Sequence, residues 1–155
     1  MKKFIFSKNN IKENHIIIYG RHASLSAILN KNRTIKNIIL AKENRKLEIE
    51  LITLLRKTGK KILIEKVDKK FIEGLIGKNI KHQGILLLAN KLIKKSFEEV
   101  FNKSNFRAGV LLDKITDPNN IGSIYRSALC FNLDFIVNLE RGSSKETGSL
   151  LNSAC

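Results

Sequence analysis

The chain has 155 residues, a formal net charge of +15 and a hydrophobic content of 43%. That length fits one ordinary domain or two small ones, and the hydrophobic content is that of a globular protein rather than a disordered one. The longest apolar runs, around Ile16–Tyr19 and Ile85–Ala89, are far shorter than the roughly 20 residues that a membrane-spanning helix needs. We therefore expect no membrane span.

Targeting signals and metal ligands are also not expected. The amino end starts with positive charge but lacks a sustained apolar core and a small-residue cleavage site, so we expect a cytoplasmic protein. Two cysteines, Cys130 and Cys155, provide no disulfide framework. The histidines, His15, His22 and His82, are dispersed without carboxylate companions at ligand spacing, which argues against a metal site.

The excess positive charge lies entirely in the front part of the chain. Residues 1–106 hold 24 Lys and Arg against 9 Asp and Glu, whereas residues 107–155 hold 5 of each kind. Such an asymmetry indicates attraction to a polyanion, and RNA or DNA phosphate is the natural candidate. The alternative is a solvated lysine-rich face without a binding role.

Strands and helices alternate through the front part. Residues 1–14 are polar and lack periodicity, so a mobile arm is expected there. The pattern then predicts a break at Tyr19–Gly20, a helix to Asn30 or Asn32, a strand at Ile35–Ala41, a helix closed by Thr58–Gly59, a strand at Ile62–Val67, a short helix from a cap at Asp68 to Gly77, and a strand at Ile85–Ala89. This alternation predicts a compact α/β domain over residues 15–90, with helices covering a central sheet.

A charged segment with scattered apolar residues, 91–106, is expected to link this domain to a second one at 107–155. The linker pattern allows a helical turn or two around Phe97–Phe101. In the second part, strands are predicted at Ala108–Asp113 and Asp134–Glu140, and the closing residues are expected to begin another helix.

The turn after the first of these strands is the candidate site. Pro118 pre-sets its backbone, and Asn120 is expected to cap a helix that begins at Ile121. A helical wheel divides this helix into an apolar half and a polar half. The apolar half holds Ile121, Ile124, Tyr125, Ala128, Leu129 and Phe131, and the polar half holds Gly122, Ser123, Arg126, Ser127 and Cys130.

A strand end followed by a helix start offers backbone N–H groups and a positive dipole end to an anion. Gly122 is expected to leave room for close approach, and Arg126 can fork onto a phosphate or hold a ribose hydroxyl. The residues alone leave a structural alternative open, in which Asn120 caps the helix, Gly122 packs and Arg126 faces solvent.

The run D-P-x-N-x-G-x-x-x-R-x-A, from Asp117 to Ala128, closely resembles the first signature motif of the SpoU/TrmH class of RNA ribose 2′-O-methyltransferases. The sequence Y-G-R-H-A at Tyr19–Ala23 is similar to the start of that family's substrate-binding domain, and H-Q-G-I at His82–Ile85 to its end. The stretch after Leu139 also resembles the family, at Arg141, Ser144 and Ser153–Ala154.

The resemblance implies a small ribosomal-protein-like α/β domain that binds rRNA or tRNA, followed by an α/β-knot (SPOUT) methyltransferase domain that binds S-adenosylmethionine. A homodimer is expected of the complete family fold. The resemblance further implies that Arg126 is the catalytic residue at the target ribose and that Asn120 supports the site. Because arginine stays protonated far above neutral pH, we expect Arg126 to orient the 2′-hydroxyl and an adjacent phosphate, with any proton transfer assisted by RNA phosphate.

Four residues are expected to contact RNA, with a plain surface role as the alternative for the first two: Arg21, His22, Gly122 and Ser123. The family's second and third motifs, which supply the cofactor loops, have no counterpart before Cys155, so no cofactor-binding residue is assigned. We expect a truncated, inactive form that binds S-adenosylmethionine weakly or not at all. The alternatives are a non-catalytic RNA-binding module and a gene remnant without a molecular role.

Overall fold

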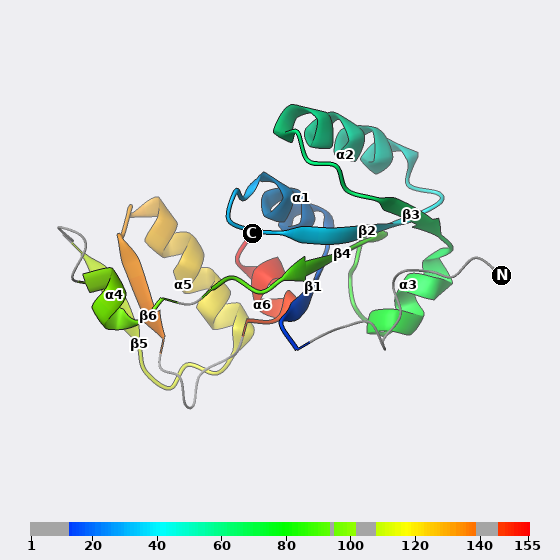
Figure 1. Ribbon diagram of the computed structural model, residues 1–155. Helices are drawn as coiled ribbons and strands as arrows, with labels where there is room; N and C mark the ends of the chain where they lie inside the picture. The colour runs from blue at the N-terminus through cyan, green and yellow to red at the C-terminus, as the bar shows by residue number, and fades with distance from the viewer. Residues whose placement is uncertain (1–12, 94, 102–107, 139–145) are drawn as a thin grey trace. The chain divides into compact units, whose positions relative to one another are not determined.

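The computed structural model describes residues 13–93, 95–101, 108–138 and 146–155 (Figure 1). The chain divides into two compact units, Met1–Lys91 and Leu92–Cys155. In the first unit the elements are β1 (His15–Tyr19), α1 (Arg21–Leu29), β2 (Ile35–Ala41), α2 (Arg45–Thr58), β3 (Ile64–Val67), α3 (Lys69–Ile76) and β4 (Ile85–Asn90). In the second they are α4 (Phe97–Phe101), β5 (Gly109–Leu112), α5 (Pro118–Cys130), β6 (Phe135–Asn138) and α6 (Gly148–Ser153).

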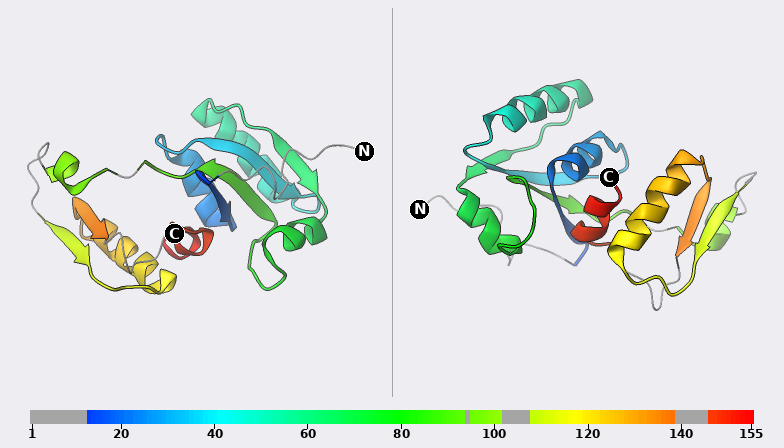
Figure 2. Two further views of the ribbon diagram at one scale, coloured as in Figure 1. Left: turned by 60° about the horizontal axis from the view of Figure 1, so that its bottom comes forward. Right: turned by 180° about the vertical axis from the view of Figure 1, so that it is seen from behind.

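The first unit is built on a four-stranded sheet with the strand order β1-β4-β2-β3. Strand β4 runs antiparallel to both of its neighbours, whereas β2 and β3 are parallel. Helices α1 and α2 lie on one face of this sheet and α3 on the other (Figures 1 and 2). Because both faces are covered, the two central strands are almost continuous apolar runs, as the sequence pattern indicates.

Helix α2 shows why the chain forms its elements where it does. The Asn44 side chain accepts a hydrogen bond from the Leu47 N–H at 3.4 Å and caps the helix start. Gly59 ends the helix in the left-handed conformation at φ 67°. Between these signals Leu47, Leu51 and Leu55 recur every four residues and are buried, so the helix packs one stripe on the sheet. The predicted helix end is confirmed.

Two features around β3 differ from the prediction. The strand begins at Ile64 rather than Ile62, because its ladder with β2 starts at the pair of Ile38 and Ile64. Asp68 stands at the predicted cap position of α3, but its side chain accepts no N–H from that helix. Its carboxylate accepts a hydrogen bond from the Lys42 ammonium instead, at 3.0 Å.

The second unit contains a parallel pair of strands, β5 and β6, joined by α5. Leu112 lies opposite Asn138 where the two strands end. A small core forms between the strands, α5 and α6 from Leu112, Ile121 and Leu150. The predicted strand Asp134–Glu140 is found as β6, and its last two residues lie outside the described ranges.

None of the helices in the described ranges has the length and apolar content that crossing a bilayer requires.

Candidate functional site

Helix α5 begins three residues earlier than predicted. The Asp117 carboxylate accepts the Asn119 N–H at 2.9 Å and caps the helix, and Pro118 occupies its first position. Proline suits that position because its missing N–H would have no partner inside the helix. The prediction that Asn120 caps the helix is therefore wrong: Asn120 lies inside the first turn, with its side chain exposed.

The start of α5 is fastened to α6. The Ser153 hydroxyl lies 2.9 Å from the carbonyl oxygens of both Pro118 and Leu150, and its proton can be donated to either. Gly122 is buried beneath Ser153, so it does not leave the room for close approach that is expected from the sequence. Contact with α6 also changes which side of α5 is covered. Leu129 and Phe131, predicted to pack, are 82% and 77% exposed.

Arg126 is exposed on α5, and among the described residues no hydrogen bond or ion pair engages its guanidinium. Ser123 is exposed as well and lies one turn earlier on the same side. Asn120 and Arg126 are six residues apart, so at about 100° per residue they lie about 120° apart around the helix. The helix thus presents Ser123 and Arg126 together as a polar, cationic stripe, with Asn120 on its flank.

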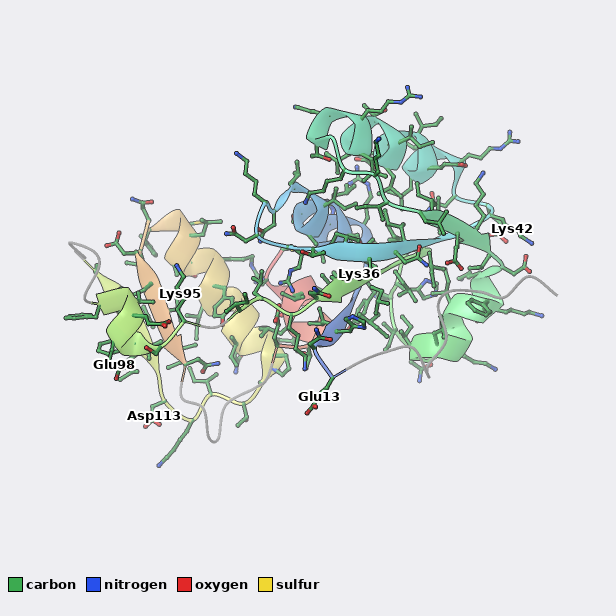
Figure 3. All side chains as sticks on the ribbon, viewed as in Figure 1. Glu13, Lys36, Lys42, Lys95, Glu98 and Asp113 are labelled. Carbon is green, nitrogen blue, oxygen red and sulfur yellow. The ribbon has the colours of Figure 1, made fainter. Side chains whose placement is uncertain are left out.

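The carboxyl ends of β5 and β6 supply a residue that the sequence did not single out. The side-chain oxygen of Asn138, at the end of β6, is buried and has no hydrogen-bond partner among the described residues. In open α/β sheets, ligands bind outside the carboxyl ends of parallel strands. Asp113, which follows β5, is exposed on the outside of the second unit (Figure 3). In the sequence, the only signal for a role of Asn138 is its position directly after an apolar run.

A tyrosine on α5 remains a hydrogen-bond donor. Burial raises the pKa of Tyr125 above its ordinary 10.0, and the negative charge of Glu146 raises it further. The phenol is therefore protonated at neutral pH and packs against the core of the second unit.

In the first unit, the H-Q-G turn before β4 is held rigidly. His82 is 3% exposed, and its Nδ1 accepts the Gly84 N–H at 3.0 Å. Burial is the main reason that the pKa of His82 is lowered from 6.5; the charge of Glu73 opposes this shift and that of Lys69 adds to it. A neutral imidazole can accept this hydrogen bond, whereas a protonated one cannot.

The same turn joins the starts of two helices. The Gln83 side chain accepts the Arg21 N–H at 2.7 Å at the start of α1, and the Gln83 carbonyl accepts from the Asn44 amide at 3.1 Å at the start of α2. The motifs Tyr19–Ala23 and His82–Ile85, far apart in sequence, therefore meet where β1 ends and β4 begins.

The predicted RNA contacts fall in different environments. The Arg21 guanidinium forks onto both oxygens of Glu50, at 3.0 and 2.5 Å, so it is already paired. His22 is exposed beside it, and Ser123 is exposed on α5. Gly122 is covered by α6. These contacts with RNA stay predictions, and Arg141 and Ser144 lie outside the described residues.

A cavity of about 620 Å³ opens beside the turn, between the start of α2 and α3. Its lining is rich in charged and amide side chains: Glu43, Asn44, Lys69, Glu73, Lys78, Asn79, Lys81 and Gln83, with Ala41, Ile80, His82 and Gly84. Lys69 is paired with Glu73 at 3.7 Å. Lys78 and Lys81 are exposed and make no ion pair within the described residues.

Comparison with known proteins places these features in a family context. A family model described as RNA 2′-O ribose methyltransferase substrate binding matches residues 17–94. A putative TrmH family tRNA/rRNA methyltransferase of Staphylococcus epidermidis is 30% identical over 132 residues, which are 83% of this chain and 51% of the relative. The corresponding protein of Staphylococcus haemolyticus is 31% identical with the same coverage. The chain thus spans about half the length of the curated relatives it matches.

Solved structures show the same fold. The SpoU methyltransferase AviRb from Streptomyces viridochromogenes, in complex with the cofactor AdoMet, matches 96% of this chain and 54% of its own, with a TM-score of 0.71 and 16% identity. An rRNA methyltransferase from Sinorhizobium meliloti matches 96% of this chain and 53% of its own, with a TM-score of 0.63 and 15% identity. The predicted fold class, a small α/β domain followed by the first part of an α/β-knot domain, is confirmed.

Proposed function

The chain belongs to the SpoU/TrmH family of RNA methyltransferases, and from this membership we propose that it serves in methylating a ribose 2′-hydroxyl of rRNA or tRNA. The match of residues 17–94 to the family's substrate-binding model carries this proposal. The motif on α5, with Asn120, Gly122 and Arg126, supports it independently, because it belongs to the other unit. We assign RNA binding to residues 15–90 and the methyl-transfer site to 107–155.

Arg126 is the residue proposed to act on the target ribose. Its guanidinium is exposed and unpaired in the described chain, so it is free to fork onto the 2′-oxygen and an adjacent phosphate. As the 2′-oxygen forms its bond to the methyl carbon, the hydroxyl proton must leave. Because arginine keeps its own protons at neutral pH, Arg126 orients the nucleophile, and RNA phosphate takes part in moving the proton.

S-adenosylmethionine would supply the electrophilic methyl group for this reaction through cleavage of its sulfur–methyl bond, with S-adenosylhomocysteine as the leaving group. The buried oxygen of Asn138, which has no partner in the part of the chain that the structure describes, fits a ligand that donates hydrogen bonds, as the amino and ribose hydroxyl groups of this cofactor do. We propose that Asn138 contacts the cofactor where β6 ends. For the complete family fold we further propose a homodimer, which sedimentation can test.

Methyl transfer gives the direct test. The protein is incubated with rRNA or tRNA and methyl-labelled S-adenosylmethionine, and the RNA is then hydrolysed with alkali. A methylated 2′-oxygen blocks cleavage at its nucleotide, so any label that the chain transfers should remain in alkali-resistant dinucleotides. Label on a base would contradict the 2′-hydroxyl assignment. Salt-sensitive RNA binding without any transfer would favour a non-catalytic RNA-binding module.

A further inference from the structure

We propose that the cavity beside the H-Q-G turn binds one unstacked nucleotide of an RNA substrate, with Lys78 and Lys81 on its phosphates and Asn79 on its base. This inference rests on the proposed function only in taking RNA as the ligand. The cavity volume of about 620 Å³ falls within the range of about 300–1,000 Å³ that is usual for small-molecule sites. A single nucleotide is a ligand of that class.

The charges in the lining favour a phosphate. Three lysines and two glutamates contribute side chains, and the pair of Lys69 and Glu73 neutralises itself at 3.7 Å. The remaining charged residues of the lining are Lys78, Lys81 and Glu43, which leaves an excess positive charge. Neither lysine has a carboxylate partner in the described part of the chain. Neutralising RNA phosphates is the main use of such lysines in nucleic-acid binding.

The amide side chains in the lining differ in whether their hydrogen-bonding groups are already engaged within the protein. The Asn44 side chain is occupied, because its oxygen accepts from Leu47 and its nitrogen donates to Gln83. The side-chain oxygen of Gln83 already accepts a hydrogen bond from the Arg21 backbone N–H. Asn79 is exposed, and no hydrogen bond engages its side chain among the described residues. It therefore offers a free amide donor and acceptor to a base edge.

The wall behind these groups is rigid. Gln83 has φ 52° and Gly84 has φ 77°, and the turn is held by His82 from inside the domain and by hydrogen bonds to α1 and α2 from outside. No aromatic side chain of the described residues lines the cavity. A base would thus be bound through its edge rather than by stacking, which suits an unpaired nucleotide in a loop or bulge.

Equilibrium binding to two labelled RNAs tests the proposal with the full 155-residue chain. One RNA is a stem-loop with unpaired loop nucleotides, and the other is a fully paired duplex with the same number of phosphates. We expect the double variant Lys78→Gln, Lys81→Gln to bind the stem-loop on the order of tenfold more weakly. The salt slope, which is the slope of the logarithm of the binding constant against the logarithm of the salt concentration, should fall in magnitude by about 2. The wild-type preference for the stem-loop should be lost.

A matched control is the double variant Lys57→Gln, Lys61→Gln, which removes the same charge at the opposite end of α2. Its affinity should fall by less than about threefold, and equally for both RNAs. The variant Asn79→Ala should weaken stem-loop binding while keeping the salt slope.

The outcomes separate this inference from the proposed function. If the two double lysine variants lose the same affinity for both RNAs, the proposal of a nucleotide pocket is wrong, while the proposal of RNA binding stands. If Asn79→Ala binds the stem-loop as well as wild type, the cavity is an anion site and the nucleotide assignment is wrong. If the wild-type chain binds neither RNA, both the pocket and the RNA-binding role of the first unit are wrong.

Discussion

Gly122 lies so close beneath Ser153 that a Cβ atom built on it would come within 2.7 Å of the Ser153 carbonyl carbon and would overlap the hydroxyl. The motif glycine thus serves the packing of α6 on α5. The Ser153 hydroxyl bonded to the Pro118 carbonyl completes the contact, at the first turn of the helix that carries Asn120 and Arg126.

Gly122→Ala should destabilise the second unit. The clash includes the Ser153 backbone as well as its side chain, so rotating the side chain cannot relieve it, and it should cost more than the roughly 1 kcal/mol that alanine gains over glycine in a helix. We expect a net loss of about 1–2 kcal/mol, measured by hydrogen exchange of the α5 and α6 amides. Gly74→Ala, in α3, has nothing within 4 Å of its Cβ and should stabilise that helix by about 0.5–1 kcal/mol. Unchanged protection in α6 would contradict the packing role.

Gly84→Ala should cost more than the same change at Gly59. Both glycines have positive φ, at 77° and 67°, so both substitutions should cost about 1–2 kcal/mol in backbone strain. At Gly84 the new methyl would also lie 3.2 Å from both the Ala41 Cβ and the Asn44 amide nitrogen, whereas at Gly59 nothing lies within 4 Å. Chemical denaturation of the two variants measures the difference. Equal losses would show that the turn yields easily.

The stability of the first unit should fall as the pH drops below about 6.5. Burial lowers the folded-state pKa of His82 from 6.5, so the unfolded chain takes up a proton first. The stabilising contribution is complete above the unfolded pKa and is lost as the pH falls through the folded one. His82→Asn can keep an acceptor near the Gly84 N–H without titrating, so it should flatten this part of the profile. Urea unfolding at several pH values gives the unfolding free energy of the wild-type chain and of His82→Asn. If the two free energies change in parallel with pH, the pH dependence comes from other groups.

Arg126→Lys should leave stability unchanged and impair methyl transfer. The side chain is exposed and makes no hydrogen bond or ion pair in the described chain, so we expect a change in unfolding free energy within about 0.5 kcal/mol. Lysine keeps the charge but cannot make the two-pronged contact, so transfer should fall about 100-fold in any preparation that shows activity. Full turnover by the lysine variant would refute the orienting role. Ser127→Ala, exposed on the same helix, is the matched control.

Most of the fold follows from local sequence signals. Helix α2 is bounded by a side-chain cap at Asn44 and a left-handed glycine at Gly59, both of which act within a few residues. The buried strands β2 and β4 are almost continuously apolar, apart from Lys36 and Asn37 in β2 and Asn90 at the end of β4, because helices cover both faces of the sheet. Such signals do not depend on distant parts of the chain, so the sequence predicts them well.

The start of α5 was mispredicted because two neighbouring residues are both good caps. Asp117 and Asn120 each have a short polar side chain, and Pro118 fits a turn as well as the first position of a helix. The hydrogen bond from Asn119 to Asp117 decides between the two starts. The predicted exposure of Gly122 failed for a different reason, since its partner Ser153 lies on α6 and no local pattern links them.

By itself, the sequence determined the alternation of strands and helices, the concentration of positive charge in the front part, and the motif residues Asn120, Gly122 and Arg126. Tertiary structure alone decided that Gly122 packs under α6, that the buried oxygen of Asn138 has no partner within the described ranges, and that Lys78, Lys81 and Asn79 border one cavity. The physical reason is the range of the interactions. Caps, turns and amphipathic periods act between near neighbours, whereas burial and shared cavities depend on which distant segments the fold brings together.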